Sequence, residues 1–326
     1  MSRRLIALGV SALILAALWW RVDPAAIWSA VGAADPGWLV AGLAAVIPLT
    51  MVTAWRFQLL SRGALGTAST VRLMLSSSTL NLVLPSKLGD LAKAWVLTRR
   101  HGFGGEMALA IVVLEKLLDM ASLLVWGVVA LLWIAGGRIE LLLAAAAVGG
   151  LLLLVIVLLL PLPFAAALIA RIGGLLPGKP ARMLTGFADE WRAVLQWFWG
   201  ERARATLVVL VSLAAWAMHL TQFWLFARAL DASVPLIHNM AYATLSILVG
   251  LAPFTIAGIG TRDVAIVFFY GPWLHAGQGA VLGLLATTRY LLPAIAGLPF
   301  MGDYVDAARP VKVQAPEGQE PVQRRP

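Results

Sequence analysis

Residues 141–160 read LLLAAAAVGGLLLLVIVLLL, a run of twenty residues without a charged side chain. A helix of about 20 apolar residues crosses the hydrocarbon core of a bilayer, because each residue adds about 1.5 Å. The whole chain shares this character, since 61% of its 326 residues are hydrophobic and only 13% are charged. Soluble domains are about 45–50% apolar and about 25% charged. The sequence therefore predicts an all-α polytopic membrane protein and excludes most soluble enzymes and ordinary DNA-binding modules.

Other apolar stretches of similar length predict further spans. Residues 140–160 are one expected spanning segment. The other five are residues 1–21, 37–57, 108–135, 205–228 and 279–300. A secretory signal is the alternative for the first segment. No small-x-small cleavage site closes its apolar run, however, and Trp19 and Trp20 suit a membrane interface. We therefore expect about six spanning helices.

Two apolar stretches are broken. Residues 73–84 are too short to cross and run into Pro85, and residues 240–274 are interrupted by Pro253 and by glycines. Broken apolar segments are typical of re-entrant hairpins, whose freed backbone groups face a cavity lined by protein or water. The sequence therefore predicts two re-entrant or broken hairpins.

The distribution of basic residues predicts the orientation. Nineteen of the 25 Lys and Arg residues lie in segments that this layout places on one side, and the loops on the other side hold only Arg21 and Arg138. The basic segments are residues 1–4, 56–106, 161–204 and 302–326. By the positive-inside rule both termini are cytoplasmic. The hairpins then enter from opposite sides, as in an inverted repeat. We expect one membrane domain over 1–302 and a disordered, polar tail over 303–326.

The motif EKLLD at residues 115–119 places two carboxylates inside a predicted span. Glu115 and Asp119 are four residues apart, so they share one face of a helix. Ionisable groups within a membrane are costly and usually functional, which makes these two candidates for a water-filled cavity. The alternative is that Glu115 and Lys116 are solvated at the cytoplasmic interface.

The first broken stretch carries a polar cluster. A broken helix with such residues could present backbone donors and Lys charges to a phosphate. Equally, it could be a cytoplasmic turn followed by a helix capped by Asp90. The cluster consists of Asn81, Pro85, Lys87, Gly89, Asp90 and Lys93.

The second broken stretch contains GIGTRD at residues 258–263. Gly258 and Gly260 permit tight backbone turns. Arg262 can offer a planar fork to a lipid phosphate, or it can pair with a carboxylate of the 115–119 motif. Thr261 and Asp263 are both candidate caps for the following helix.

Three more polar residues interrupt predicted spans. Arg56, at the end of a span, is interpreted as an interface anchor. Arg289 and Tyr290 lie within the last span and could face a cavity.

The sequence lacks the motifs of P-loop nucleotide binding, zinc proteases and serine hydrolases. It has no G-x-x-x-x-G-K-[ST], no H-E-x-x-H and no G-x-S-x-G, and it contains no cysteine. No cofactor, metal site or catalytic residue is expected, and the net charge of +9 is attributed to cytoplasmic loops and not to nucleic-acid binding.

Four motifs together resemble one family. WR at 55–56, LPSKLGDLAK at 84–93, EKLLD and GIGTRD are similar to the membrane domain of lysylphosphatidylglycerol synthases, which also occurs as stand-alone flippase-like membrane proteins of bacteria and archaea. The likeness covers about residues 5–300. Members often carry Gly-Arg in place of Ser86-Lys87 and Glu in place of Asp90 or Asp263, so the charges are kept. The synthase activity of fused members lies in an additional cytoplasmic domain and is not expected here.

The resemblance implies a flippase that moves an anionic or modified lipid between leaflets of the bacterial inner membrane. Lys87, Lys93 and Arg262 are expected to meet the lipid phosphate, and Glu115 and Asp119 to balance these cations or accept a basic headgroup. The expected substrate-binding residues are Asn81, Lys87, Asp90, Lys93, Glu115, Asp119, Arg262 and Asp263, and the backbone-shaping residues are Pro85, Gly89, Gly258 and Gly260.

Two alternatives stay open. One is a non-transporting subunit or scaffold of an envelope-lipid or polysaccharide assembly, whose partners are envelope-biosynthesis proteins or a second copy of the chain. The other is a membrane-embedded glycosyl- or phosphotransferase that uses Glu115 and Asp119.

Overall fold

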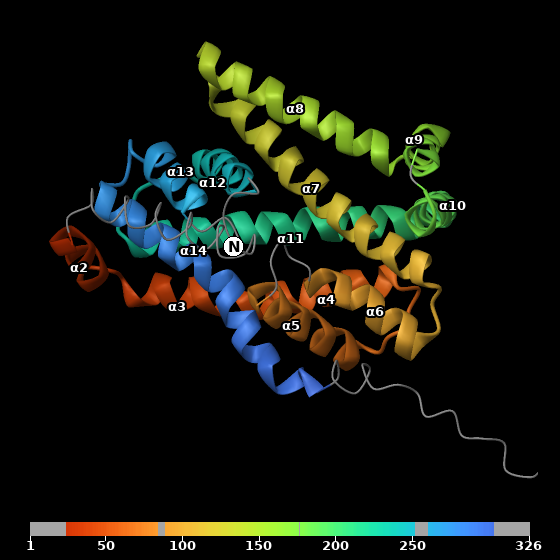
Figure 1. Cartoon of the computed structure of the whole chain (residues 1–326). Helices are drawn as coiled ribbons and strands as arrows, with labels where there is room; N and C mark the ends of the chain where they lie inside the picture. Colours follow the sequence, from red (N-terminus) through yellow and green to blue (C-terminus); the bar gives the residue numbers. More distant parts are fainter. Residues whose placement is uncertain (1–23, 84–88, 176, 252–259, 303–326) are drawn as a thin grey trace, which may run out of the picture.

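The computed structural model describes residues 24–83, 89–175, 177–251 and 260–302, and every regular element in these ranges is a helix (Figure 1). The all-α prediction is confirmed. The helices are α2 (Pro24–Gly32), α3 (Pro36–Ala44), α4 (Val46–Leu60), α5 (Thr67–Val83), α6 (Gly89–His101), α7 (Gly105–Ala135), α8 (Ile139–Leu159), α9 (Pro163–Gly174), α10 (Lys179–Gly200), α11 (Arg202–Ala229), α12 (Leu236–Gly250), α13 (Thr261–Phe269), α14 (Ala276–Gly297) and η2 (Leu298–Phe300).

Five helical segments are long and apolar enough to cross a membrane, so the protein is a multi-pass membrane protein. They match five of the six predicted spans, and the sixth, within residues 1–21, lies outside the described residues. The five segments are Pro36–Leu60, Gly105–Ala135, Ile139–Leu159, Arg202–Ala229 and Ala276–Phe300.

Two pairs of shorter helices correspond to the broken stretches. The described part of residues 73–84 lies in α5, which α6 follows, and the stretch 240–274 contains most of α12 and all of α13. α5 packs against α6, and α12 packs against α13. In chain order each pair stands between two spans, α4 and α7 for the first pair and α11 and α14 for the second. Figure 1 shows α5 and α6 toward one end of α11, and α12 and α13 toward its other end. This arrangement agrees with the predicted hairpins on opposite sides of the bundle.

Small residues let the helices approach closely. A Cβ atom at Gly297 would overlap the backbone oxygen of Leu75, so α14 rests directly on α5. Thr79 reinforces this contact, because its hydroxyl donates a hydrogen bond to the carbonyl oxygen of Ala294 at 2.6 Å. Such contacts are typical of membrane proteins, in which lipid provides little hydrophobic drive for helix association.

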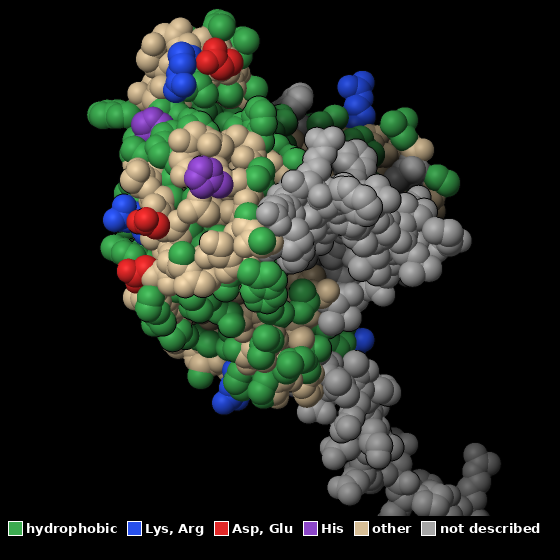
Figure 2. All heavy atoms as spheres, turned by 90° about the vertical axis from the view of Figure 1, so that its left-hand side faces the viewer, with side chains coloured by type: hydrophobic (Ala, Val, Ile, Leu, Met, Phe, Trp, Pro, Cys, Tyr) green, Lys and Arg blue, Asp and Glu red, His purple; other side chains and the backbone are tan. Residues whose placement is uncertain are grey.

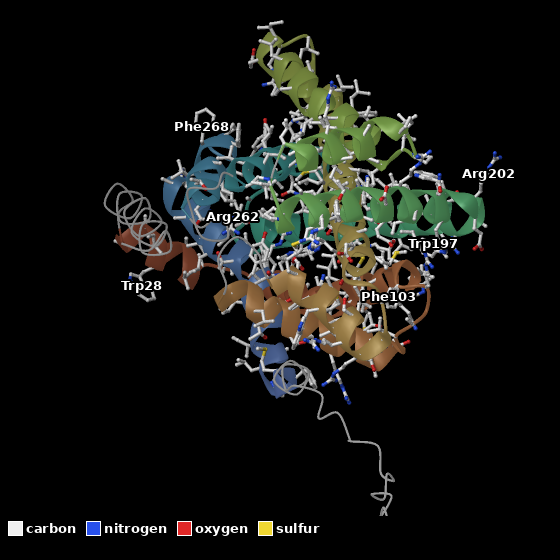
Figure 3. The ribbon with its side chains drawn as sticks, turned by 45° about the vertical axis from the view of Figure 1, so that its right-hand side comes forward. Trp28, Phe103, Trp197, Arg202, Arg262 and Phe268 are labelled. Carbon is white, nitrogen blue, oxygen red and sulfur yellow. The ribbon has the colours of Figure 1, made fainter. Side chains whose placement is uncertain are left out.

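The two ends of the bundle differ in side chains. Arg202 and Trp197 lie near one end, and the exposed aromatic residues Trp28 and Phe268 lie near the other (Figure 3). The end face formed around α2 is mostly hydrophobic or neutral, with scattered charged side chains (Figure 2). Arg202 and Trp197 belong to the segment 161–204, which the sequence predicts to face the cytoplasm.

Candidate functional site

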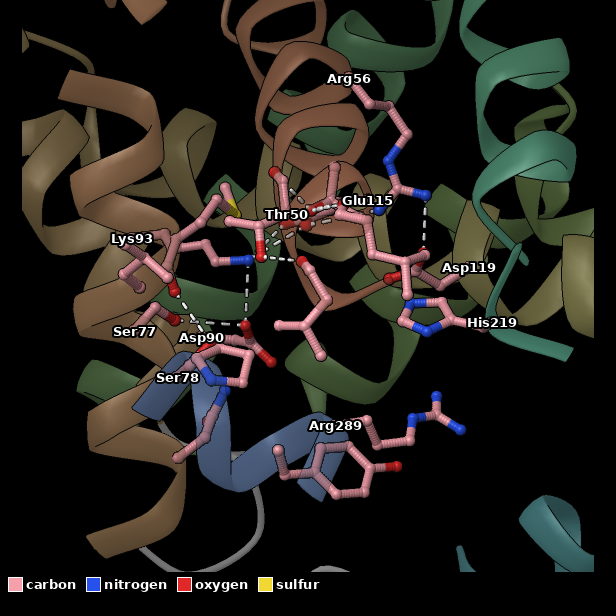
Figure 4. A pocket seen from close by; sticks show the side chains of 18 of the residues that line it. Thr50, Arg56, Ser77, Ser78, Asp90, Lys93, Glu115, Asp119, His219 and Arg289 are labelled. Carbon is pink, nitrogen blue, oxygen red and sulfur yellow. Dashed lines mark hydrogen bonds and ion pairs between the residues drawn. The ribbon is translucent and has the colours of Figure 1, made fainter. Parts of the chain in front are cut away.

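A cavity of about 240 Å³ lies inside the bundle (Figure 4). Its walls come from α4, α5, α6, α7, α11 and α14. The first helix pair therefore contributes to the cavity, whereas none of its described lining residues comes from α12 or α13. The charged lining residues are Arg56, Asp90, Lys93, Glu115, Lys116, Asp119 and Arg289.

Glu115 lies at the centre of an ion-pair network. The ammonium group of Lys93 donates to both carboxylate oxygens of Glu115, at 3.0 and 3.1 Å. The guanidinium of Arg56 lies 3.5 Å from the same carboxylate. All three side chains are almost fully buried, so their mutual pairing offsets the cost of removing the charges from water.

Two further carboxylates extend the network. Asp119 accepts a hydrogen bond from Arg56 at 2.6 Å and another from the indole of Trp216 at 3.2 Å. Asp90 pairs with Lys93 at 3.1 Å and with Lys116 at 3.2 Å. Three carboxylates thus alternate with three cations, and the network as a whole is electrically neutral.

Asp90 remains ionised in this setting. Burial alone would raise the pKa of its carboxyl group, but the adjacent charges of Lys93 and Lys116 hold that pKa well below its ordinary value. The Asp90 charge is therefore present throughout the neutral pH range.

The interpretation of Arg56 as an interface anchor is wrong. Its side chain is 1% exposed and joins two carboxylates of α7. An Arg at the end of an apolar run usually reaches for the interface, but here α4 turns this position toward α7 and α11. The Arg56 guanidinium also donates a hydrogen bond to the hydroxyl of Ser212 of α11 at 3.3 Å, so it is surrounded by partners from α7 and α11.

The structure brings Glu115 and Asp119 to the same side of α7, facing the cavity (Figure 4). Solvation of Glu115 at an interface does not occur, because the residue is 2% exposed. Lys116 and Asp119 are more accessible, with side chains 43% and 22% exposed.

Arg262 and Asp263 lie apart from the cavity lining. Arg262 pairs with Asp263 at 2.7 Å and donates hydrogen bonds to Gly283 and Thr287 of α14 at 2.9 and 2.8 Å. Of the two alternatives for Arg262, pairing with a carboxylate of the 115–119 motif does not occur, because its carboxylate partner is Asp263. The sequence could not decide between partners on different helices, and here the nearest partner is the adjacent residue. Arg262 connects α13 to α14 and is not among the described residues that line the cavity.

Asp263 also organises the start of α13. Its carboxylate accepts a hydrogen bond from the backbone N–H of Gly260 at 3.0 Å, as the predicted cap would do. Gly260 has φ +97°, a conformation that favours glycine. Gly258, Pro85 and Lys87 lie outside the described residues.

Gly89 and Asn81 form the junction of the first helix pair. A Cβ atom at Gly89 would overlap the backbone nitrogen of Asn81 and lie 2.5 Å from the backbone oxygen of Ser77. Gly89 therefore lets α6 begin against α5, which places Asp90 and Lys93 in the cavity wall. The amide oxygen of Asn81 is buried without a hydrogen-bond partner and lines the same cavity.

Sequence reasoning missed some of the lining. Arg289 and Tyr290 face the cavity as expected, and His219 and Gln222 of α11 join them there. Within the described ranges, no three His, Asp or Glu side chains form a group suited to a metal ion. The three carboxylates of the cavity are paired with Lys and Arg.

The helical spans, the two pairs of shorter helices and the buried charged cavity define a polytopic helical membrane protein. A family model described as the lysylphosphatidylglycerol synthase TM region matches residues 4–297, so the chain belongs to this family. A comparison with curated proteins found no match.

Proposed function

We propose that the protein is a translocase that moves an anionic or modified lipid between the leaflets of the bacterial inner membrane, with both termini in the cytoplasm. The observation that carries the proposal is the cavity lined by buried charges of both signs within a helical membrane bundle. Charged side chains inside a membrane are costly and typically mark substrate pathways. Membership of this family supports the same proposal.

The size of the cavity indicates how a lipid would use it. At about 240 Å³ it is smaller than the roughly 300–1,000 Å³ of sites that enclose drug-sized ligands. It therefore suits a polar headgroup, and the acyl chains stay in the surrounding bilayer. The lipid is moved and not chemically altered.

The charges would replace water around the headgroup. The partly exposed side chains of Lys116 and Asp119 offer a cation and a carboxylate, so charged headgroup substituents of either sign can find a partner. The buried ion pair between Lys93 and Glu115 fixes α6 against α7 next to these two side chains.

The two helix pairs provide a basis for alternating access. α5 and α6 contribute directly to the cavity wall, and α13 acts on α14 through Arg262. Because no nucleotide-binding motif is present, transport is expected to run downhill, to couple to an ion gradient or to rely on a partner ATPase.

Ser78→Trp tests the proposal by filling the cavity. Ser78 lines it from α5, and its hydroxyl donates a hydrogen bond to the carbonyl oxygen of Met74 in the same helix. We expect the wild-type protein in proteoliposomes to move fluorescent phosphatidylglycerol, with or without an imposed proton gradient. The variant should reduce movement to that of protein-free vesicles, because the bulky indole takes the headgroup space.

The matched control is Leu153→Trp, which places the same side chain on the exposed surface of α8. It should transport normally, and both variants should elute as folded monodisperse protein. Undiminished transport by folded Ser78→Trp would contradict the cavity route. A folded wild-type protein that moves no lipid and co-purifies with a fixed partner would instead support the scaffold alternative.

A further inference from the structure

Arg289 differs from the other cations that line the cavity. Arg56, Lys93 and Lys116 each contact at least one carboxylate within 4 Å. Arg289 is only 9% exposed, yet in the described part of the chain it has no ion pair, and its Nη1 atom is buried without a hydrogen-bond partner. Figure 4 shows it extending from α14 without a dashed line to any neighbour.

Aromatic rings hold the Arg289 guanidinium in position. Its central carbon lies 5.1 Å from the ring centre of Tyr290, 5.4 Å from that of Phe223 and 5.9 Å from that of Trp216. Cation–π contacts stabilise the positive charge of a guanidinium group through the ring faces, so they do not occupy its N–H groups as hydrogen-bond donors. The guanidinium is therefore oriented while its donors remain available.

The charge balance of the cavity points to the same residue. Its described lining contains four cations and three carboxylates. The carboxylates are all engaged with Arg56, Lys93 and Lys116, so the single excess positive charge belongs to Arg289. Nearby α11 contributes another buried polar atom without a hydrogen-bond partner, Nδ1 of His219. A cavity with one excess cation is suited to one monoanionic group.

We propose that Arg289 is the receptor for the phosphodiester group of the transported lipid. The planar guanidinium matches two phosphate oxygens with two parallel hydrogen bonds, which a Lys cannot reproduce. This inference rests on the proposed lipid translocation and assigns its anion-binding residue. The sequence predicts that Lys93 and Arg262 contact the phosphate, but both are already paired with carboxylates. The inference assigns this contact to Arg289 of α14 instead.

Equilibrium binding to the purified full-length protein tests the inference. Radiolabelled phosphatidylglycerol is the probe, with diacylglycerol as the analogue that lacks phosphate. We expect Arg289→Gln to weaken phosphatidylglycerol binding by about tenfold or more, as for the loss of a bidentate charge-assisted contact, and to leave diacylglycerol binding unchanged. Arg289→Lys should be intermediate. Both variants should fold, because Arg289 leaves no buried carboxylate unpaired.

Arg228→Gln is the matched control. Arg228 also lies over two tryptophans, Trp38 at 5.7 Å and Trp224 at 6.0 Å, but it does not line the cavity. Its loss should leave binding unchanged. Wild-type affinity in folded Arg289→Gln, or an equal loss in Arg228→Gln, would overturn the inference. Displacement of the lipid by inorganic phosphate at comparable affinity would overturn the lipid assignment and indicate a site for free phosphate.

Binding and transport separate the two proposals. If the wild-type protein binds phosphatidylglycerol through Arg289 but does not move it, the receptor assignment stands and the translocase proposal fails. If it moves the lipid and Arg289→Gln binds normally, the translocase proposal stands and the receptor assignment fails.

Discussion

Replacement of Lys93 by Met is expected to lower the free energy of unfolding by about 3–5 kcal/mol, the usual cost of removing one partner from a buried ion pair. Without Lys93, the one ion pair left to the Glu115 carboxylate among the described residues is the 3.5 Å contact with Arg56. Glu115 is 2% exposed, so water cannot replace the lost ammonium group. The change is measured by titrating the protein from mild detergent into SDS and following its helical circular dichroism.

The control for this prediction is Lys116→Met. The Lys116 side chain is 43% exposed, so its removal should change stability by less than about 1 kcal/mol. The double variant Lys93→Met with Glu115→Gln should recover part of the loss, because no unpaired carboxylate remains at position 115. Equal stability of Lys93→Met and the wild-type protein would contradict a buried network.

Gly89→Ala is also expected to lower the free energy of unfolding, here because the added methyl group clashes with neighbouring backbone atoms. The added methyl group would overlap the backbone of Asn81 and approach that of Ser77, and neither atom can rotate away as a side chain could. Forced overpacking costs about 1–3 kcal/mol, and the upper part of this range is expected here because backbone atoms are involved. The same SDS titration measures it.

This substitution should also impair lipid movement. Asp90 and Lys93 follow Gly89 on α6, and Ser77 donates a 2.9 Å hydrogen bond to the carbonyl oxygen of Gly89. Displacing the start of α6 therefore displaces the cavity wall. We expect the leaflet assay to show a clear loss even under conditions in which the variant stays folded.

Gly105→Ala is the matched control, because Gly105 is also the first residue of a helix. A Cβ atom there meets nothing within 4 Å, and Ala favours helix formation over Gly, so stability should stay the same or rise slightly. If Gly89→Ala is as stable and as active as Gly105→Ala, the close approach of α5 and α6 does not govern the site.

Much of the fold could be predicted from local sequence. The spans follow from the length of apolar runs, since a helix that satisfies its own backbone hydrogen bonds is the simplest way to cross lipid. The breaks in residues 73–84 and 240–274 followed from Pro, Gly and polar residues, and the structure has two helix pairs there. Glu115 and Asp119 share a face because a 3.6-residue repeat is a local property.

The partners of the charges could not be predicted in this way. Arg56 and Asp119 are 63 residues apart, and their 2.6 Å contact depends on how α4 and α7 are rotated and placed against each other. Arg262 could in principle reach several carboxylates, but the packing of α13 on α14 leaves it with Asp263. Hydrophobic periodicity carries no information on which polar faces meet.

The sequence thus determines which segments enter the membrane and which residues carry charge into it, because both follow from the transfer of local chain segments from water to lipid. Tertiary packing determines which of these charges are paired. It also leaves Arg289 without an ion pair among the residues that the structure describes. Ion pairing falls off over a few ångströms, so it is decided by the relative placement of helices that are distant in the chain.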